Sequence, residues 1–176
     1  MECHYRSRPP GLQTALRKTL EPNPDTMTDS SPKKSARGSR ARSIARKLAM
    51  QALYQWQLTQ QSAAEIKQQY LEGDDSAGVD AEHFSELVTQ CIARQAEITG
   101  ALTPFIDRPL EQLDPVEAAI LMIGMYELQQ RLDIPYRVVI NEGVDLCKRF
   151  GATEAHKYIN AVLDRAARDI RAAERQ

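Results

Sequence analysis

Three arginines lie close together at the start of one helical segment. Arg40, Arg42 and Arg46 belong to SRARSIARKLAMQALYQWQL, residues 39–58. A guanidinium pairs with phosphate through its N–H donors and stacks on bases, and recognition of single-stranded RNA uses both contacts. The arginines therefore suggest a polyanionic ligand, although from charge alone a solvated basic segment is an equally good interpretation.

The same segment has the pattern of an amphipathic helix. Apolar residues wrap around one side at about 100° per residue. They are Ile44, Ala45, Leu48, Ala49, Ala52, Leu53 and Trp56. Arg42, Arg46 and Tyr54 fall outside this stripe, so we expect all three to be exposed. Basic residues at a helix start oppose the helix dipole, and such a locally unfavourable choice is mild evidence for function.

The charge is unevenly distributed along the 176 residues. Residues 1–48 hold 11 Lys and Arg against 4 Asp and Glu, whereas the remainder holds 12 basic and 20 acidic residues, for a total of −1. Residues 1–38 contain five prolines and no helical period, which predicts a disordered basic leader. We expect residues 39–176 to form a single domain, acidic enough to suit a basic partner.

Catalytic, metal and membrane signatures are weak. The histidines and cysteines share no metal-ligand spacing, and no glycine-rich phosphate loop is present. The histidines are His4, His83 and His156, and the cysteines are Cys3, Cys91 and Cys147. No apolar run approaches the roughly 18 residues that span a bilayer. We therefore expect no enzyme activity, no cofactor and no metal, and a cytoplasmic protein without a membrane segment.

The remaining periodicity predicts an all-α protein of six or seven helices in two groups. Helices are expected over 63–71, 81–102, 115–128 and 136–150, with a final helix capped by Thr153. The 115–128 helix has the clearest start signal, because Asp114 is a good N-cap, Pro115 follows it and Glu117 completes a capping-box spacing. Its apolar residues lie on every face, so it should be the most buried.

The final helix presents a second polar surface. Lys157 and Tyr158 are adjacent in its first turn. An exposed tyrosine beside a lysine could stack on a base while the lysine holds a phosphate. The alternative is that Tyr158 packs its ring against a neighbouring helix.

Three separated motifs give the sequence a resemblance to a known family. ARSIARKLAMQALYQWQL, LDPVEAAILMIGMYEL and IPYRVVINEGVDLCKRFGATEAHKYINAVLD occur in this order between residues 40 and 171. Together they resemble the NusB family of transcription antitermination and ribosomal RNA processing factors. The resemblance implies seven helices in two three-helix bundles and no catalysis. It also implies pairing with NusE, a small ribosomal subunit protein, binding of the boxA element of nascent RNA, and assembly with NusA, NusG and RNA polymerase.

The resemblance also assigns roles to individual residues. It places RNA contacts at Arg40, Arg42, Arg46, Lys157 and Tyr158, and NusE contacts at Tyr54, Glu117 and Glu154. Ser43 and Ile44 interrupt the arginine run that some members have, and Glu154 stands where an aspartate is familiar. Glu117 is also explained as a capping-box residue that needs no partner.

Two alternatives share the helical signature. Ribosomal RNA cytosine-5 methyltransferases carry a NusB-like amino-terminal domain, but their catalytic part needs a further α/β domain. The other alternative is a helical scaffold that binds only proteins.

Overall fold

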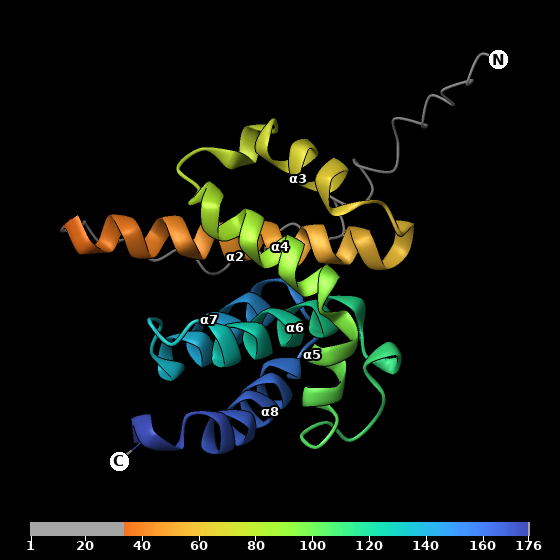
Figure 1. Ribbon diagram of the computed structural model, residues 1–176, viewed down its shortest axis with the longest axis vertical. Helices are drawn as coiled ribbons and strands as arrows, with labels where there is room; N and C mark the ends of the chain where they lie inside the picture. Colours follow the sequence, from red (N-terminus) through yellow and green to blue (C-terminus); the bar gives the residue numbers. More distant parts are fainter. Residues whose placement is uncertain (1–33, 176) are drawn as a thin grey trace.

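The computed structural model describes residues 34–175, which contain seven α-helices (Figure 1). The α-helices are α2 (Lys34–Thr59), α3 (Ala63–Leu71), α4 (Ala81–Ala93), α5 (Gln95–Leu102), α6 (Pro115–Gln130), α7 (Tyr136–Phe150) and α8 (Ala155–Ile170). Three short 3₁₀ turns are η1 (Asp74–Ser76), η2 (Leu110–Gln112) and η3 (Ala172–Arg175). The predicted all-α class is confirmed.

The helices form two groups, as the resemblance implied. In Figure 1, α2, α3 and α4 pack together in the upper half, while α6, α7 and α8 pack together in the lower half. α2 also packs along α6, and α5 packs against α6, so the two groups share one core. The proline-rich segment after α5 contains the short 3₁₀ turn η2.

The central position of α6 is confirmed. Its residues from Val116 to Leu128, with Glu117 excepted, are buried. A Cβ added at Gly124 would lie 2.7 Å from Cδ2 of Leu163 on α8, which is closer than van der Waals contact permits. The glycine therefore lets α8 approach α6 closely.

Two helix boundaries differ from the sequence prediction. α2 begins at Lys34 rather than at Ser39, so the last residues assigned to the leader are helical. No proline follows Pro32 in this stretch, and Lys, Ala and Arg favour helix. The rest of the predicted leader, residues 1–33, lies outside the described residues. The expected helix over 81–102 is two helices, because the backbone leaves helical geometry at Arg94 (φ −108°, ψ 22°).

The helix caps are confirmed in part. The Asp114 side chain accepts a hydrogen bond from the Val116 amide at the start of α6. Among the described hydrogen bonds, none joins Glu117 to the Asp114 backbone, so the predicted capping box is not formed there. Thr153 is not the cap of α8. That position belongs to Glu154, which has a left-handed backbone (φ 68°) and no side-chain capping bond.

Neither a metal cluster nor a membrane span is found in residues 34–175. No group of three or more His, Cys, Asp or Glu side chains in this part of the chain is placed to hold a metal ion. None of the described helices is both long and apolar enough to cross a membrane. Cys91 and Cys147 are free, buried thiols.

Candidate nucleic-acid and protein interfaces

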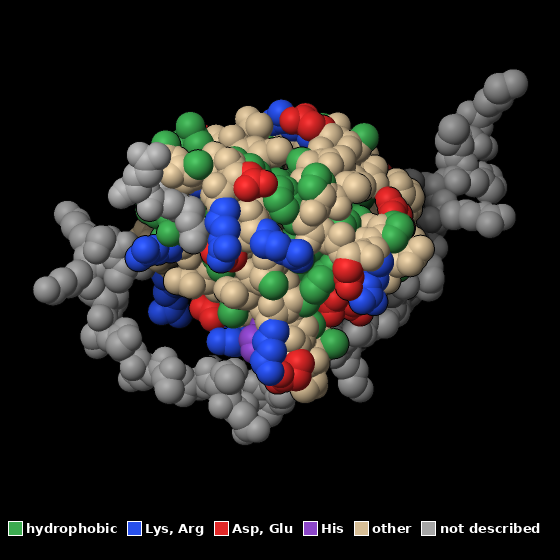
Figure 2. Space-filling view, turned by 90° about the horizontal axis from the view of Figure 1, so that it is seen from below, with side chains coloured by type: hydrophobic (Ala, Val, Ile, Leu, Met, Phe, Trp, Pro, Cys, Tyr) green, Lys and Arg blue, Asp and Glu red, His purple; other side chains and the backbone are tan. Residues whose placement is uncertain are grey.

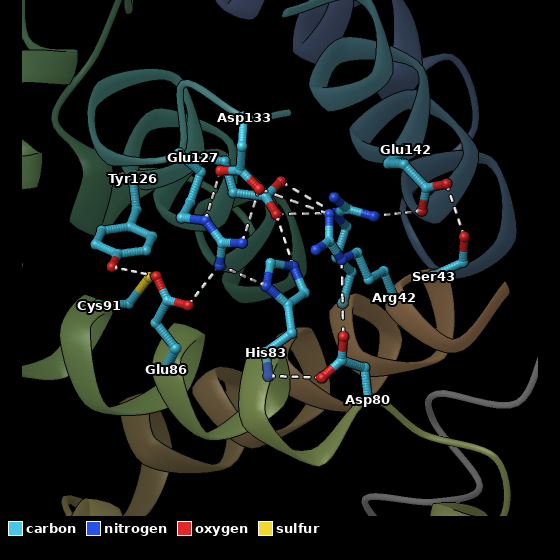
Figure 3. Close-up of polar contacts among 12 residues, drawn as sticks. Arg42, Ser43, Asp80, His83, Glu86, Cys91, Tyr126, Glu127, Asp133 and Glu142 are labelled. Carbon is cyan, nitrogen blue, oxygen red and sulfur yellow. Dashed lines mark hydrogen bonds and ion pairs between the residues drawn. The ribbon is translucent and has the colours of Figure 1, made fainter. Parts of the chain in front are cut away.

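The first turns of α2 present two of the three predicted arginines. Arg40 is exposed, and the Arg42 side chain is 40% exposed. The Arg42 guanidinium lies 3.7 Å from a carboxylate oxygen of Asp80 and 3.7 Å from one of Asp133. Figure 3 shows the three side chains pointing toward one another. The two aspartates hold the arginine at the surface without using its donors in short hydrogen bonds.

Arg46 is the exception, and its predicted exposure is wrong. Its side chain is only 3% exposed, and Nε lies 3.0 Å from both carboxylate oxygens of Glu127 on α6. Nη1 also lies 3.5 Å from Glu142 on α7. The helical wheel placed Arg46 outside the apolar stripe, but α6 and α7 cover that side of α2 as well. A guanidinium held in this way is not available to RNA.

The carboxylate of Glu127 organises a buried polar cluster beneath the arginines (Figure 3). It accepts hydrogen bonds from Arg46 and, at 2.9 Å, from Nε2 of His83 on α4. Burial by itself raises the pKa of Glu127, but the bonds from His83 and Arg46 outweigh it, and the net pKa is lowered. The sequence did contain a signal for this cluster, since a charged residue inside an all-apolar helix needs a buried partner.

Arg131 extends the cluster to the surface loop between α6 and α7, residues 131–135. Its guanidinium contacts Nδ1 of His83, a Glu86 oxygen and both oxygens of Asp133. Because the Arg131 guanidinium can only donate, Nδ1 of His83 accepts from it and Nε2 donates to Glu127. The hydrogen bonds from Arg131 lower the pKa of Asp133 to about 2, so this aspartate remains anionic beside Arg42.

A groove opens between the start of α2 and the 131–135 loop. Its volume is about 570 Å³. The polar wall includes Arg42, Asp80 and Asp133, the apolar wall includes Ile134, Pro135 and Val138, and Arg46 also contributes. We call this feature the α2 groove. It combines an exposed cation, two carboxylates and an apolar surface, which are the ingredients of a site for a planar polar ligand.

The other predicted RNA residues lie at the first turn of α8. The Lys157 side chain is 70% exposed and forms an ion pair with Glu154. Tyr158 is partly buried, packs against the core, and donates a hydrogen bond from its hydroxyl to Asp107 at 3.0 Å. Hydrogen bonds from Arg108 and Tyr158 lower the pKa of Asp107 to about 2. The ring therefore packs on the core, as the alternative interpretation expects, and its contact with RNA stays a prediction.

The structure does not bring the two sets of predicted RNA residues together. Arg171, directly after α8, donates to main-chain oxygens of Leu128, Arg131 and Ile134, beside the loop that Arg42 contacts. Tyr158 lies 13 residues earlier, about 20 Å away along the helix. Seen from the α8 side, Lys and Arg side chains alternate with acidic ones and form no single basic patch (Figure 2).

The predicted partner residues lie at the same end of the molecule as Tyr158. Gln57 on α2 donates to the Pro115 carbonyl at the start of α6, which brings Tyr54 and Glu117 to one region. Tyr54 packs partly against the core, and Leu58, one turn later, is 56% exposed. Burial and then the nearby Asp114 raise the pKa of Glu117. Leu58 is an exposed apolar residue that the sequence analysis did not single out.

Charge interactions connect this region to the start of α8. The Arg108 guanidinium interacts electrostatically with both Glu117 and Tyr158, and Tyr158 follows the Glu154–Lys157 ion pair. Tyr54, Glu117, Glu154, Lys157 and Tyr158 thus belong to one end, which we call the α8-start end. Arg40, Arg42 and the α2 groove belong to the other.

Comparison with known proteins gives one consistent result. A family model described as the NusB family matches residues 43–168. The transcription antitermination protein NusB of Idiomarina loihiensis is 47% identical over 131 residues, covering 74% of this chain and 94% of that protein. The NusB protein of Pseudomonas putida (strain W619) is 50% identical over 143 residues, covering 81% and 84%. The solved structure of T. maritima NusB superposes with a TM-score of 0.63 at 25% identity, covering 73% and 91%.

Proposed function

The chain belongs to the NusB family of transcription antitermination proteins, and from this premise we propose that it binds boxA RNA together with NusE. In this proposal the pair joins NusA, NusG and RNA polymerase on nascent ribosomal RNA, which places the protein in the cytoplasm. The chain acts by binding and has no enzymatic role. The family model, which is that of a transcription antitermination family, supports this proposal.

The exposed guanidinium of Arg42 is the observation that carries the RNA part of the proposal. The buried charges around it are paired, whereas Arg42 makes only two contacts of 3.7 Å and, among the described residues, no hydrogen bond. A surface guanidinium with free donors suits phosphate oxygens or base acceptors. Arg40, also exposed, adds a second cation next to it.

The α8-start end supports the partner part of the proposal. Tyr54 and Leu58 supply apolar and aromatic surface, and Glu117 and Glu154 supply negative charge that complements a basic ribosomal protein. Lys157 and the Tyr158 ring lie beside them. We propose that RNA reaches this end when the partner is bound, since about 20 Å of α8 separates Tyr158 from the end of the helix beside the loop that Arg42 contacts.

Titration of a boxA-length RNA, with and without NusE and at two salt concentrations, tests this function. Affinity should fall as salt rises, because phosphate contacts release counterions. Arg42→Ala should weaken binding about tenfold, the order expected for one charged contact. Arg168→Ala is the matched control, since Arg168 is exposed on α8 and paired only with Asp164.

Equal affinity for boxA and a scrambled RNA of the same length, with NusE present, would overturn the antitermination proposal. Retained NusE binding without any RNA binding would instead favour the protein-only scaffold.

A further inference from the structure

We propose that the α2 groove binds one unpaired RNA base and selects guanine, and that Asp80 and Asp133 set this selectivity beside Arg42. The inference rests on the proposed RNA-binding function. It specifies that this end of the molecule recognises a base of the RNA. It also assigns a role in RNA recognition to two acidic residues, although such recognition is usually attributed to basic side chains alone.

The carboxylates make the groove a poor site for a phosphate alone. Asp80 and Asp133 each place an oxygen 3.7 Å from the Arg42 guanidinium, and their side chains are 31% and 52% exposed. A phosphate that approached Arg42 from the groove would meet two negative charges for one accessible positive charge. Like charges at such distances repel, so a ligand must offer donors to the aspartates as well as acceptors to the arginine.

Guanine offers this combination on two adjacent edges that share O6. Its O6 and N7 atoms accept hydrogen bonds from a guanidinium, while N1–H and the N2 amino group donate to a carboxylate. O6 and N1 are neighbours on the ring, which matches a guanidinium and a carboxylate that stand side by side. Uracil has a single N–H donor between two acceptors, and adenine and cytosine lack a second N–H donor next to the amino group.

The free hydrogen-bonding capacity of the groove fits this assignment. Asp80 uses Oδ1 to cap α4 by accepting from the His83 amide, and its Oδ2 atom has only the long contact to Arg42. Asp133 is fixed by its two bonds to Arg131. Oδ2 of Asp80 and the Arg42 guanidinium thus line the groove and can each form further hydrogen bonds with a ligand.

The rest of the groove suits a flat, partly apolar ring. Ile134, Pro135 and Val138 form the apolar wall, and Val138 is 38% exposed. The volume of about 570 Å³ lies within the range of small-ligand pockets. Arg171 holds this wall rigidly, because it donates to the Ile134 carbonyl from behind. The site is therefore preformed in the free protein.

A guanosine-to-inosine comparison tests the proposal, because inosine lacks only the N2 amino group. The probes are single-stranded RNAs of about 12 nucleotides, a length within the usual range for such sites. One carries a single guanosine among uridines, one carries inosine at that position, and one is all uridine. Each is titrated into the full chain and into its mixture with NusE. The variants are Asp80→Asn, Asp133→Asn and the double variant, and asparagine at position 80 preserves the helix cap.

The unaltered chain should bind the guanosine probe about tenfold more tightly than the inosine probe, the effect of one hydrogen bond to a charged group. The double variant should lose this ratio and bind the all-uridine probe more tightly, since two repulsive charges are gone. Glu82→Gln is the matched control. It removes an exposed acidic residue from the first turn of α4, the helix that Asp80 caps, and Glu82 does not line the groove. Circular dichroism checks that each variant is folded.

Equal binding of all three probes by the unaltered chain would overturn the guanine assignment while leaving RNA binding intact. An unchanged guanosine-to-inosine ratio in the folded double variant would overturn the role of the two aspartates. Loss of NusE binding by the variants, with RNA binding unchanged, would show that the groove is a protein site. Absence of binding to every probe and to boxA RNA would overturn the proposed function, and this inference with it.

Discussion

The Nε atom of Arg46 lies 3.0 Å from both carboxylate oxygens of Glu127, in a contact where both side chains are almost fully buried. This pair joins α2 to α6, and therefore the amino-terminal helix group to the carboxy-terminal one. Removing one partner leaves an uncompensated buried charge, which typically costs about 3–5 kcal/mol. The packing of the two helix groups thus depends on Arg46, an arginine for which the family resemblance implies an RNA contact.

Arg46→Ala should lower the free energy of unfolding by about 3–5 kcal/mol. Urea denaturation followed by circular dichroism measures this change. Arg168→Ala, at an exposed ion pair, should stay within about 0.5 kcal/mol of the unaltered chain. A folded Arg46→Ala protein of normal stability and weakened RNA binding would show that Arg46 is an RNA contact after all.

The acid dependence of stability should follow the lowered pKa of Glu127. A carboxyl whose pKa is depressed below its ordinary 4.5 in the folded protein contributes stability that is present above that value. This contribution is lost as the pH falls through the lower, folded-state pKa. The free energy of unfolding should therefore decline below about pH 4.5. Because the pair is buried, the decline should persist at high salt.

Carbon-13 NMR titration of the Glu127 side-chain carboxyl checks the cause directly. Its midpoint should lie below the ordinary glutamate value of 4.5. A midpoint above 4.5 would mean that burial outweighs the bonds from His83 and Arg46.

Arg171 should be as important for stability as Arg46, although it has a different set of partners. Its side chain is 4% exposed and donates to four main-chain carbonyls between Glu127 and Ile134. Arg171→Ala removes the side-chain donor from all four carbonyls, of which those of Glu127 and Arg131 keep only the bonds from the Arg131 and Ile134 amides. The loss should cost about 3 kcal/mol. Thermal unfolding measures the loss, and Arg171→Lys should recover only part of it, because an ammonium lacks the forked geometry of guanidinium.

Loss of Arg171 should also loosen the 131–135 loop. Arg171 binds Glu174, whose other oxygen accepts from the Tyr136 amide at the start of α7. Hydrogen exchange at the Tyr136 amide should therefore accelerate in Arg171→Ala. Unchanged exchange there would show that the loop is held by the Arg131 contacts alone.

The sequence predicted most of the fold because apolar spacing reports which face of a helix is buried. It placed α3, α6 and α7 within two residues of their observed bounds. It failed at Arg46 because a wheel describes one helix, whereas burial depends on every helix packed around it. Glu127 and His83 came from separate helices, and only the fold places them within hydrogen-bond distance.

The candidate site shows the same limit. Arg40 and Arg42 were identified because several arginines lie close together in the sequence, and both are exposed in the structure. Asp80 and Asp133 could not be identified in that way, because nothing in their local sequence relates them to α2. Leu58 lies one turn after Tyr54, on the side of α2 outside the apolar stripe, and it is exposed. Sequence patterns identify which side chains could bind a ligand, whereas packing between distant segments determines which of these side chains are exposed.

Gly124 and Gly100 provide a matched pair of glycine substitutions in helices. A Cβ at Gly124 would lie 2.7 Å from Cδ2 and 3.0 Å from Cδ1 of Leu163, so Leu163 must move within a packed core. Overpacking of this kind usually costs about 1–3 kcal/mol, and we expect Gly124→Ala to destabilise by that amount. At Gly100 nothing lies within 4 Å of an added Cβ, and Gly100→Ala should stabilise by about 0.4–1 kcal/mol. Adding Leu163→Val to Gly124→Ala should restore part of the loss, because the shorter side chain vacates the space. Chemical denaturation of the single and double variants gives the coupling energy between the two positions. Strictly additive changes would show that a neighbour other than Leu163 limits the space at Gly124.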